Sequence, residues 1–183
     1  MLNAKKICLI TVITALCLGS NYALIGIPNF KVMDFFVFVT GFVFGPVIGA
    51  SVGIMIWLIY GVMNPYGFAP QVWISTMLSE TIYGFAGGAL GKWTASIDFN
   101  ENHLSLSILF GAVGLVTTLL YDLFTNIVYA FSFRVPLLVA IITGVPFALL
   151  HEISNAIIFG VCSIPLIIAL EKFIGGERFG VKK

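Results

Sequence analysis

Long apolar stretches, separated by short polar breaks, dominate the chain. Between Asp34 and Glu80 there is no Asp, Glu, Lys or Arg. About 20 consecutive apolar residues are enough for one helix to cross a bilayer, so this interval exceeds a single crossing. The pattern predicts an all-α integral membrane protein with several transmembrane helices.

Turn signals divide the apolar sequence into six expected transmembrane segments, of which the second is short. Proline is tolerated in the first turn of a helix but breaks its interior, so Pro46 and Pro146 are each expected to begin a helix. Residues 135–145 are expected to form a loop or a short re-entrant piece, and residues 1–183 a single transmembrane domain. The expected segments are 7–27, 33–44, 46–63, 70–91, 104–133 and 146–170.

Basic residues are distributed unevenly between the two sides that this arrangement defines. With six crossings both termini lie on one side, which carries seven of the nine Lys and Arg residues, whereas the other side carries Lys31 and Arg134. Cytoplasmic loops are rich in Lys and Arg, so both termini are expected in the cytoplasm. Lys5 and Lys6 before an apolar run resemble the start of a signal peptide. That run continues to residue 27, which is long enough to span, so a retained first helix is expected.

Composition supports a membrane protein and excludes several function classes. The chain is 60% hydrophobic and 9% charged, with a mean hydropathy of +1.08, whereas soluble domains carry about 25% charged residues. So little hydrophilic sequence leaves no room for a nucleotide-binding or soluble catalytic domain. The net charge of +1 and the scattered basic residues exclude nucleic acid as a partner. The three cysteines have no CxxC spacing, and no metal or cofactor is expected.

Polar side chains inside the apolar segments are the candidate functional residues, because such groups usually face a cavity or one another. Asp122 and Asn126 are four residues apart, as are His151 and Asn155, so each pair shares one helix face. Both pairs are expected in the outer half of the membrane, and Glu80 is expected near the middle of its helix. The candidate substrate-binding residues are Glu80, Gln71, Asp122, Asn126, His151, Glu152, Asn155, Tyr66, Phe68 and Trp57.

Other interpretations of these residues stay open. One is that His151 and Asp122 form an ordinary buried pair that only holds the bundle together, although three carboxylates against one histidine leave acceptors without a partner. An intramembrane enzyme is disfavoured, because Asn155 replaces the second histidine of HExxH and GxSxG is absent. Tyr66 and Phe68 form either the lid or wall of a pocket or part of an aromatic belt at the interface.

A stripe of small side chains runs along the first segment. Thr11, Ala15, Gly19 and Ala23 recur every four residues and therefore share one helix face. Small residues allow another helix to approach closely in lipid, where packing drives association. The stripe is a candidate docking surface for a partner protein, and the alternative is a contact within the bundle.

Four segments, in their order and spacing, resemble the substrate-binding S components of energy-coupling factor (ECF) transporters. These segments are GFVFGPVIGA at 41–50, ETIYGFAGGALGK at 80–92, YDLFTN at 121–126 and GVPFALLHEISN at 144–155. The resemblance implies a six-helix protein of the prokaryotic plasma membrane that captures a vitamin or related micronutrient. It also implies a transmembrane T component and two cytoplasmic ATPases as partners.

The resemblance further implies where ligand and partner bind. Family ligand sites lie near the outer face, between helices 4 to 6 and the loops after helices 1 and 3. An AxxxA pattern on helix 1 docks onto the T component, and it maps here to Ala15 and Gly19, where glycine keeps the surface small. The metal-transporting branch is disfavoured, because its N-terminal histidine-bearing segment is not found here.

The ligand itself is left open by the residues. An acidic, aromatic-walled pocket favours a neutral or cationic heterocycle, and a carboxylate ligand would need Lys31 or Arg134 at the rim. The alternatives to an S component are a self-sufficient carrier or channel that uses Glu80 or Asp122 as a proton-coupling carboxylate, and a structural subunit without a ligand.

Overall fold

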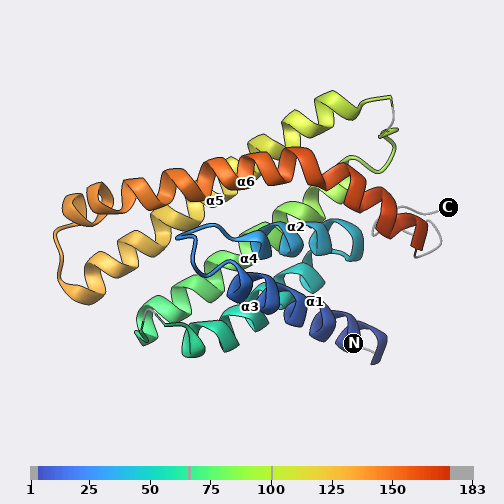
Figure 1. Cartoon of the computed structure of the whole chain (residues 1–183). Helices are drawn as coiled ribbons and strands as arrows, with labels where there is room; N and C mark the ends of the chain where they lie inside the picture. The colour runs from blue at the N-terminus through green and yellow to red at the C-terminus, as the bar shows by residue number, and fades with distance from the viewer. Residues whose placement is uncertain (1–3, 66, 100, 174–183) are drawn as a thin grey trace.

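Six α-helices account for most of the computed structural model, which describes residues 4–65, 67–99 and 101–173. No β-strand occurs in these residues, in agreement with the all-α prediction. The helices are α1 (Ala4–Ala23), α2 (Val32–Phe44), α3 (Pro46–Met63), α4 (Pro70–Trp93), α5 (His103–Phe133) and α6 (Leu137–Phe173). The start of α1 and the end of α6 lie at one end of the bundle, and the α1–α2, α3–α4 and α5–α6 connections lie at the other (Figure 1).

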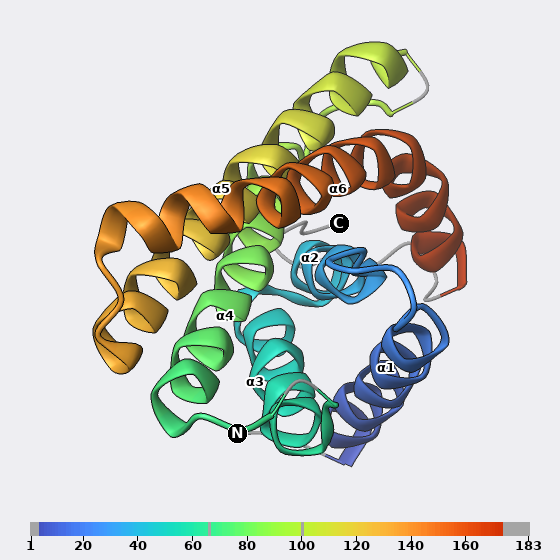
Figure 2. The same ribbon diagram turned by 60° about the vertical axis from the view of Figure 1, so that its left-hand side comes forward.

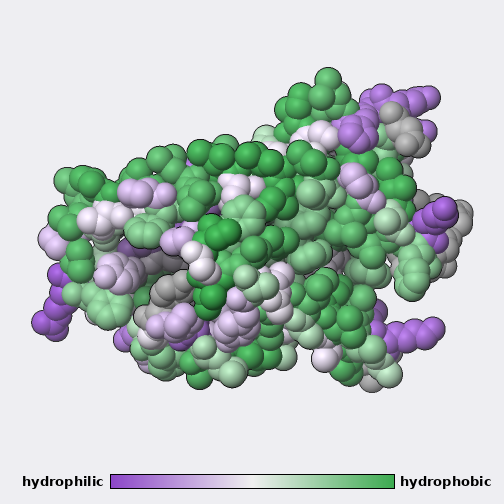
Figure 3. All heavy atoms as spheres, in the orientation of Figure 1, coloured by the Kyte–Doolittle hydropathy of each residue, from purple (hydrophilic) through white to green (hydrophobic). Residues whose placement is uncertain are grey.

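The helices have the length and surface of a multi-pass membrane protein. Within the described residues, α1, α3, α5 and α6 are long and apolar enough to cross a membrane. Helix α2 has 13 residues, as short as expected, and α4 buries a polar face that includes Ser75, Ser79 and Glu80. The visible surface is mostly apolar along its middle, and hydrophilic side chains gather mainly toward the ends (Figure 3).

The last helix differs from the expectation. Helix α6 begins at Leu137 and passes through Pro146 and Pro165, so the expected loop over 135–145 and the expected start at Pro146 are wrong. An interior proline removes one backbone hydrogen bond, whereas an irregular lipid-exposed segment would leave several backbone groups unsatisfied. The 37 residues extend about 55 Å, so α6 projects past a hydrocarbon core of about 30 Å or crosses it at a tilt.

The first helix is shifted toward the N-terminus relative to the expectation. It ends at Ala23, four residues early, and turns follow through residue 29. Gly26 and Pro28 occupy this segment, and both residues disfavour the interior of a helix. The bounds of α2 to α5 agree with the expected ones within two residues.

Helix α2 lies at the centre of the bundle, surrounded by α1, α3, α4 and α6 (Figure 2). Nearly all of its residues are buried, and it packs against α4 through glycines. A Cβ at Gly41 would lie 2.1 Å from the carbonyl oxygen of Gly84, and one at Gly84 would lie 2.4 Å from the backbone nitrogen of Ala50. These close approaches bring α2, α3 and α4 together and place the start of α2 among the polar residues of α4, α5 and α6.

Candidate substrate-binding site

A cavity of about 800 Å³ lies at the end of the bundle that carries the three connections. Its walls come from the end of α1 and the following loop, from α3, from the start of α4, and from α5 and α6. The volume is within the range of about 300–1,000 Å³ that is typical of small-molecule sites. The aromatic lining residues are Phe30, Trp57, Tyr60, Phe68, Trp73, Tyr129, Phe133 and Phe147, and the polar ones are Asn21, Asn29, Lys31, Asn64 and Thr76.

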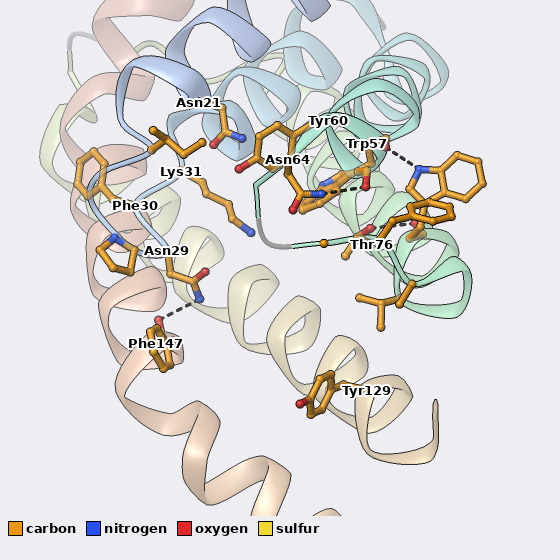
Figure 4. A pocket seen from close by; sticks show the side chains of 18 of the residues that line it. Asn21, Asn29, Phe30, Lys31, Trp57, Tyr60, Asn64, Thr76, Tyr129 and Phe147 are labelled. Atoms are coloured by element: carbon orange, nitrogen blue, oxygen red, sulfur yellow. Dashed lines mark hydrogen bonds between the residues drawn. The ribbon is translucent and has the colours of Figure 1, made fainter. Parts of the chain in front are cut away.

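Two tryptophans from adjacent helices form one wall of the cavity. The Nε1 of Trp57 on α3 donates to Oε2 of Glu80 at 2.9 Å. The Nε1 of Trp73 on α4 donates to the backbone oxygen of Trp57 at 2.8 Å (Figure 4). Both indole N–H groups are therefore bound within the protein, and the rings are held in place on the wall.

Lys31 brings a cation to the same wall from the residue that precedes α2. Its Nζ lies 5.0 Å from the ring centroid of Trp57 and 5.1 Å from that of Tyr121. A cation over an aromatic face is stabilised by about 0.5–2 kcal/mol. Among the described residues that line the cavity, Lys31 alone carries a formal charge. Nearby, Nδ2 of Asn29 donates to the backbone oxygen of Phe147 at 3.3 Å, which ties the α1–α2 loop to α6.

Behind this wall, a buried polar network joins α2, α5 and α6. The Nε2 of His151 lies 2.6 Å from Oδ2 of Asp34, and its Nδ1 lies 3.1 Å from both carboxylate oxygens of Asp122. The Nδ2 of Asn155 donates to Oδ2 of Asp34 and to Oγ1 of Thr118, each at 2.8 Å. All five side chains are buried, and none of them is among the described residues that line the cavity.

A comparison with known families identifies the chain as a transport component. The family model described as "ECF-type riboflavin transporter, S component" matches residues 1–172. The chain belongs to this family. Neither a curated protein nor a solved structure gives a significant match. The family confirms the resemblance to ECF S components, and it favours neither an enzyme nor a self-sufficient carrier.

The residues predicted for the binding site of this S component are divided between the cavity, the network and other positions. Trp57 and Phe68 line the cavity, and Glu80 reaches it through its hydrogen bond to Trp57. Asp122, His151 and Asn155 belong to the buried network, and Asn126 donates to the backbone oxygen of Asp122. Gln71 is exposed and Glu152 is half-buried, and neither lines the cavity. Tyr66 lies outside the described residues.

Asp34 is a member of the site that was not predicted. In the sequence it marks the boundary of an uncharged interval, yet its carboxylate is fully buried and binds both His151 and Asn155. The available signal is an acidic residue in the first turn of a short, otherwise apolar helix. An ionisable group in such a position is a candidate functional residue in any membrane protein.

The stripe of small residues on α1 faces away from the bundle. Thr11, Ala15, Gly19 and Ala23 are all exposed, and no heavy atom lies within 4 Å of a Cβ built at Gly19. Within the described residues, the stripe therefore lies on the surface of the bundle and not between its helices, which favours the docking interpretation over an internal contact.

Proposed function

We propose that this S component binds riboflavin at the outer face of the plasma membrane and passes it inward with a T component and two ATPases. The observation that carries the proposal is a cavity of about 800 Å³ with aromatic walls and few polar groups, in a chain whose family description names riboflavin. The cavity lies at the end that carries Lys31 and Arg134, which is the end expected outside the cell.

The chemistry of riboflavin matches the lining of the cavity. The isoalloxazine ring system is flat and tricyclic, so it stacks against aromatic side chains such as Trp57 and Phe68. Its pyrimidine edge carries carbonyl oxygens that accept hydrogen bonds, and Lys31 supplies a donor. The hydroxyl groups of the ribityl chain suit the amide groups of Asn21 and Asn29. A mostly apolar pocket with a few placed polar groups is the usual form of such sites.

Titration of the purified S component in lipid nanodiscs with riboflavin tests the proposal. We expect saturable quenching of flavin fluorescence with one ligand per protein, and mass spectrometry should detect riboflavin released from the protein as isolated. Binding of thiamine but not riboflavin would contradict the proposal.

Lys31→Met should weaken riboflavin binding by about tenfold to a hundredfold, because a hydrogen bond from a charged donor contributes about 1.5–3 kcal/mol. Arg134→Met is the matched control, since Arg134 lies at the same end of the bundle, is exposed, and is not among the described residues that line the cavity. Its affinity should stay near that of the unaltered protein. Equal losses of riboflavin affinity in both variants would indicate that positive charge at this end of the bundle matters and that the position of Lys31 in the cavity does not.

We also propose that the exposed stripe on α1 docks onto the T component. Ala15→Trp or Gly19→Trp should abolish ATP-driven uptake and co-purification with the ATPases, because a bulky side chain prevents close helix contact. Riboflavin binding by the isolated protein should survive. Val161→Trp, at an exposed position on α6, is the control and should leave uptake intact. Unchanged uptake in both α1 variants would show that the stripe faces lipid.

A further inference from the structure

Two buried carboxyl groups meet behind the wall formed by Trp57. Asp34 on α2 and Glu80 on α4 both have 0% of their surface exposed, and their carboxyls lie within hydrogen-bonding reach of one another. Oε2 of Glu80 accepts from Trp57, and Oδ2 of Asp34 accepts from His151 and Asn155. The remaining oxygens, Oε1 of Glu80 and Oδ1 of Asp34, have no donor while both carboxyls are ionised.

The charges around this pair do not balance when all acids are ionised. Three buried carboxyls, those of Asp34, Glu80 and Asp122, face at most two cations, Lys31 and His151. Both ring nitrogens of His151 lie against carboxylates, and an imidazolium, which carries a proton on each nitrogen, gives both of them a donor. A buried charge without a counter-charge is costly and is removed by protonation. The titratable or charged groups that face the pair from the surrounding elements are Cys17, Lys31, Tyr83, Tyr121 and His151. Asp122 lies against the other ring nitrogen of His151.

We propose that Asp34 and Glu80 share one proton, and that neutral Glu80 thereby holds Trp57 in the wall of the cavity. The hydroxyl of Glu80 donates to Asp34, while its other oxygen accepts the indole N–H of Trp57. The donor and acceptors of the pair are then all satisfied, which is the usual state of buried polar groups. Glu80 is a positioning residue that acts through Trp57, and this role rests on the proposed function, which assigns the cavity to riboflavin.

The shared proton makes the shape of the cavity dependent on pH. When the proton leaves at high pH, two carboxylates remain side by side in an apolar environment and repel each other. Trp57 then loses an acceptor at a fixed position. Riboflavin affinity should therefore fall as the pH rises, by up to about tenfold per pH unit above the titration midpoint. Glutamine at position 80 imitates the neutral acid, because its oxygen accepts from Trp57 and its amide donates to Asp34.

Infrared spectroscopy of the full-length protein in nanodiscs, without ligand, tests the shared proton directly. The unaltered protein should show the C=O stretching band of a protonated carboxylic acid, and this band should be missing in Glu80→Gln. Glu101→Gln is the control, since Glu101 is an exposed residue in the α4–α5 connection, and it should keep the band. Identical spectra of the unaltered protein and Glu80→Gln would overturn the proposal.

Riboflavin titration tests the positioning role. The affinity of Glu80→Gln for riboflavin should lie within about twofold of that of the unaltered protein. The affinity of the unaltered protein should depend on pH, and this dependence should be lost in Glu80→Gln. Any effect of the titration of riboflavin itself should be the same in the two proteins. Glu80→Ala and Trp57→Phe should each bind about tenfold more weakly, and the double variant no more weakly than Trp57→Phe, because the two residues act as a unit.

Two results would overturn the positioning role. The first is a loss in Glu80→Gln as large as that in Glu80→Ala, which would mean that the negative charge of Glu80 is required. The second is additive losses in the double variant, which would mean that Glu80 does not act through Trp57. If the unaltered protein does not bind riboflavin at all, the proposed function fails, and the infrared comparison still decides whether the proton is shared.

Discussion

The contact between Gly61 and Trp73 fixes the wall of the cavity at the level of single atoms. A Cβ at Gly61 would lie 2.2 Å from Cδ1 and 2.9 Å from Nε1 of Trp73. The ring cannot rotate away without breaking the hydrogen bond from its Nε1 to the backbone oxygen of Trp57. Position 61 therefore requires glycine for α3 and α4 to approach at this distance.

Gly61→Ala should lower both stability and ligand affinity. An extra methyl group in a packed contact costs about 1–3 kcal/mol of unfolding free energy, and the displaced Trp73 ring should weaken riboflavin binding. The measurements are thermal unfolding in detergent and riboflavin titration. Gly19→Ala is the matched control, because a Cβ there meets open space and alanine is the better helix former by about 1 kcal/mol. A similar destabilisation in both variants would mean that the contact with Trp73 is not the cause.

The sequence predicts some residues of the site and misses others for a physical reason. Trp57 and Phe68 could be predicted to line the cavity, because aromatic residues concentrate around the turn between α3 and α4. Asp34, which was missed, contributes through contacts with residues far away in sequence, such as its bond to His151. Lys31 was expected only at the rim of the pocket, and its contacts with Trp57 and Tyr121 are also between residues far apart in sequence. Those contacts depend on the central position of α2, and the apolar pattern of α2 does not indicate which helices surround it.

The network of His151 is the polar connection between the central helix and the α5–α6 pair. His151 belongs to α6, and its two ring nitrogens contact Asp34 on α2 and Asp122 on α5. In an apolar interior an intact contact between a histidine and a carboxyl contributes little to stability. Removal of one partner is costly, because the other partner is left buried without a compensating group. The network therefore fixes how α2, α5 and α6 pack against one another.

His151→Ala should destabilise the S component by about 3–5 kcal/mol, because the buried carboxyls of Asp34 and Asp122 would lose the ring that both of them contact. Unfolding in mixed detergent micelles measures this change. Glu152→Gln alters the neighbouring, half-buried residue and should change stability by less than about 0.5 kcal/mol. Equal stability of His151→Ala and the unaltered protein would contradict the structural role of the network.

Helix boundaries could be predicted wherever glycine or proline stands at the end of an apolar run. The bounds of α3 follow from Gly45 and Pro46 at its start and Asn64 after its end, and they agree with the expectation. The helix start expected at Pro146 is wrong, since proline begins α3 but lies inside α6. Sequence alone does not separate the two cases, because lipid favours a continuous helix over a loop that exposes its backbone.

In the whole molecule, the candidate ligand cavity and the candidate docking surface lie on different parts of the bundle. The cavity lies among the connections at one end, while the stripe of small residues runs along the outside of α1. Only the end of α1, around Asn21, Leu24 and Ile25, contributes to the cavity walls. A partner helix on the stripe can therefore contact this S component without occupying the cavity.

The orientation in the membrane determines whether the cavity faces the outside, and cysteine labelling of intact cells tests it. In a variant with Cys8, Cys17 and Cys162 replaced by alanine, a cysteine at Pro65 should react with a membrane-impermeant thiol reagent. Pro65 is exposed in the α3–α4 connection beside the cavity. A cysteine at Ser96, exposed in the α4–α5 connection at the other end, should react only after the membrane is permeabilised. The excess of Lys and Arg at the end with α4–α5 favours this result. Labelling of position 96 alone in intact cells would place the cavity on the cytoplasmic side and contradict capture from outside.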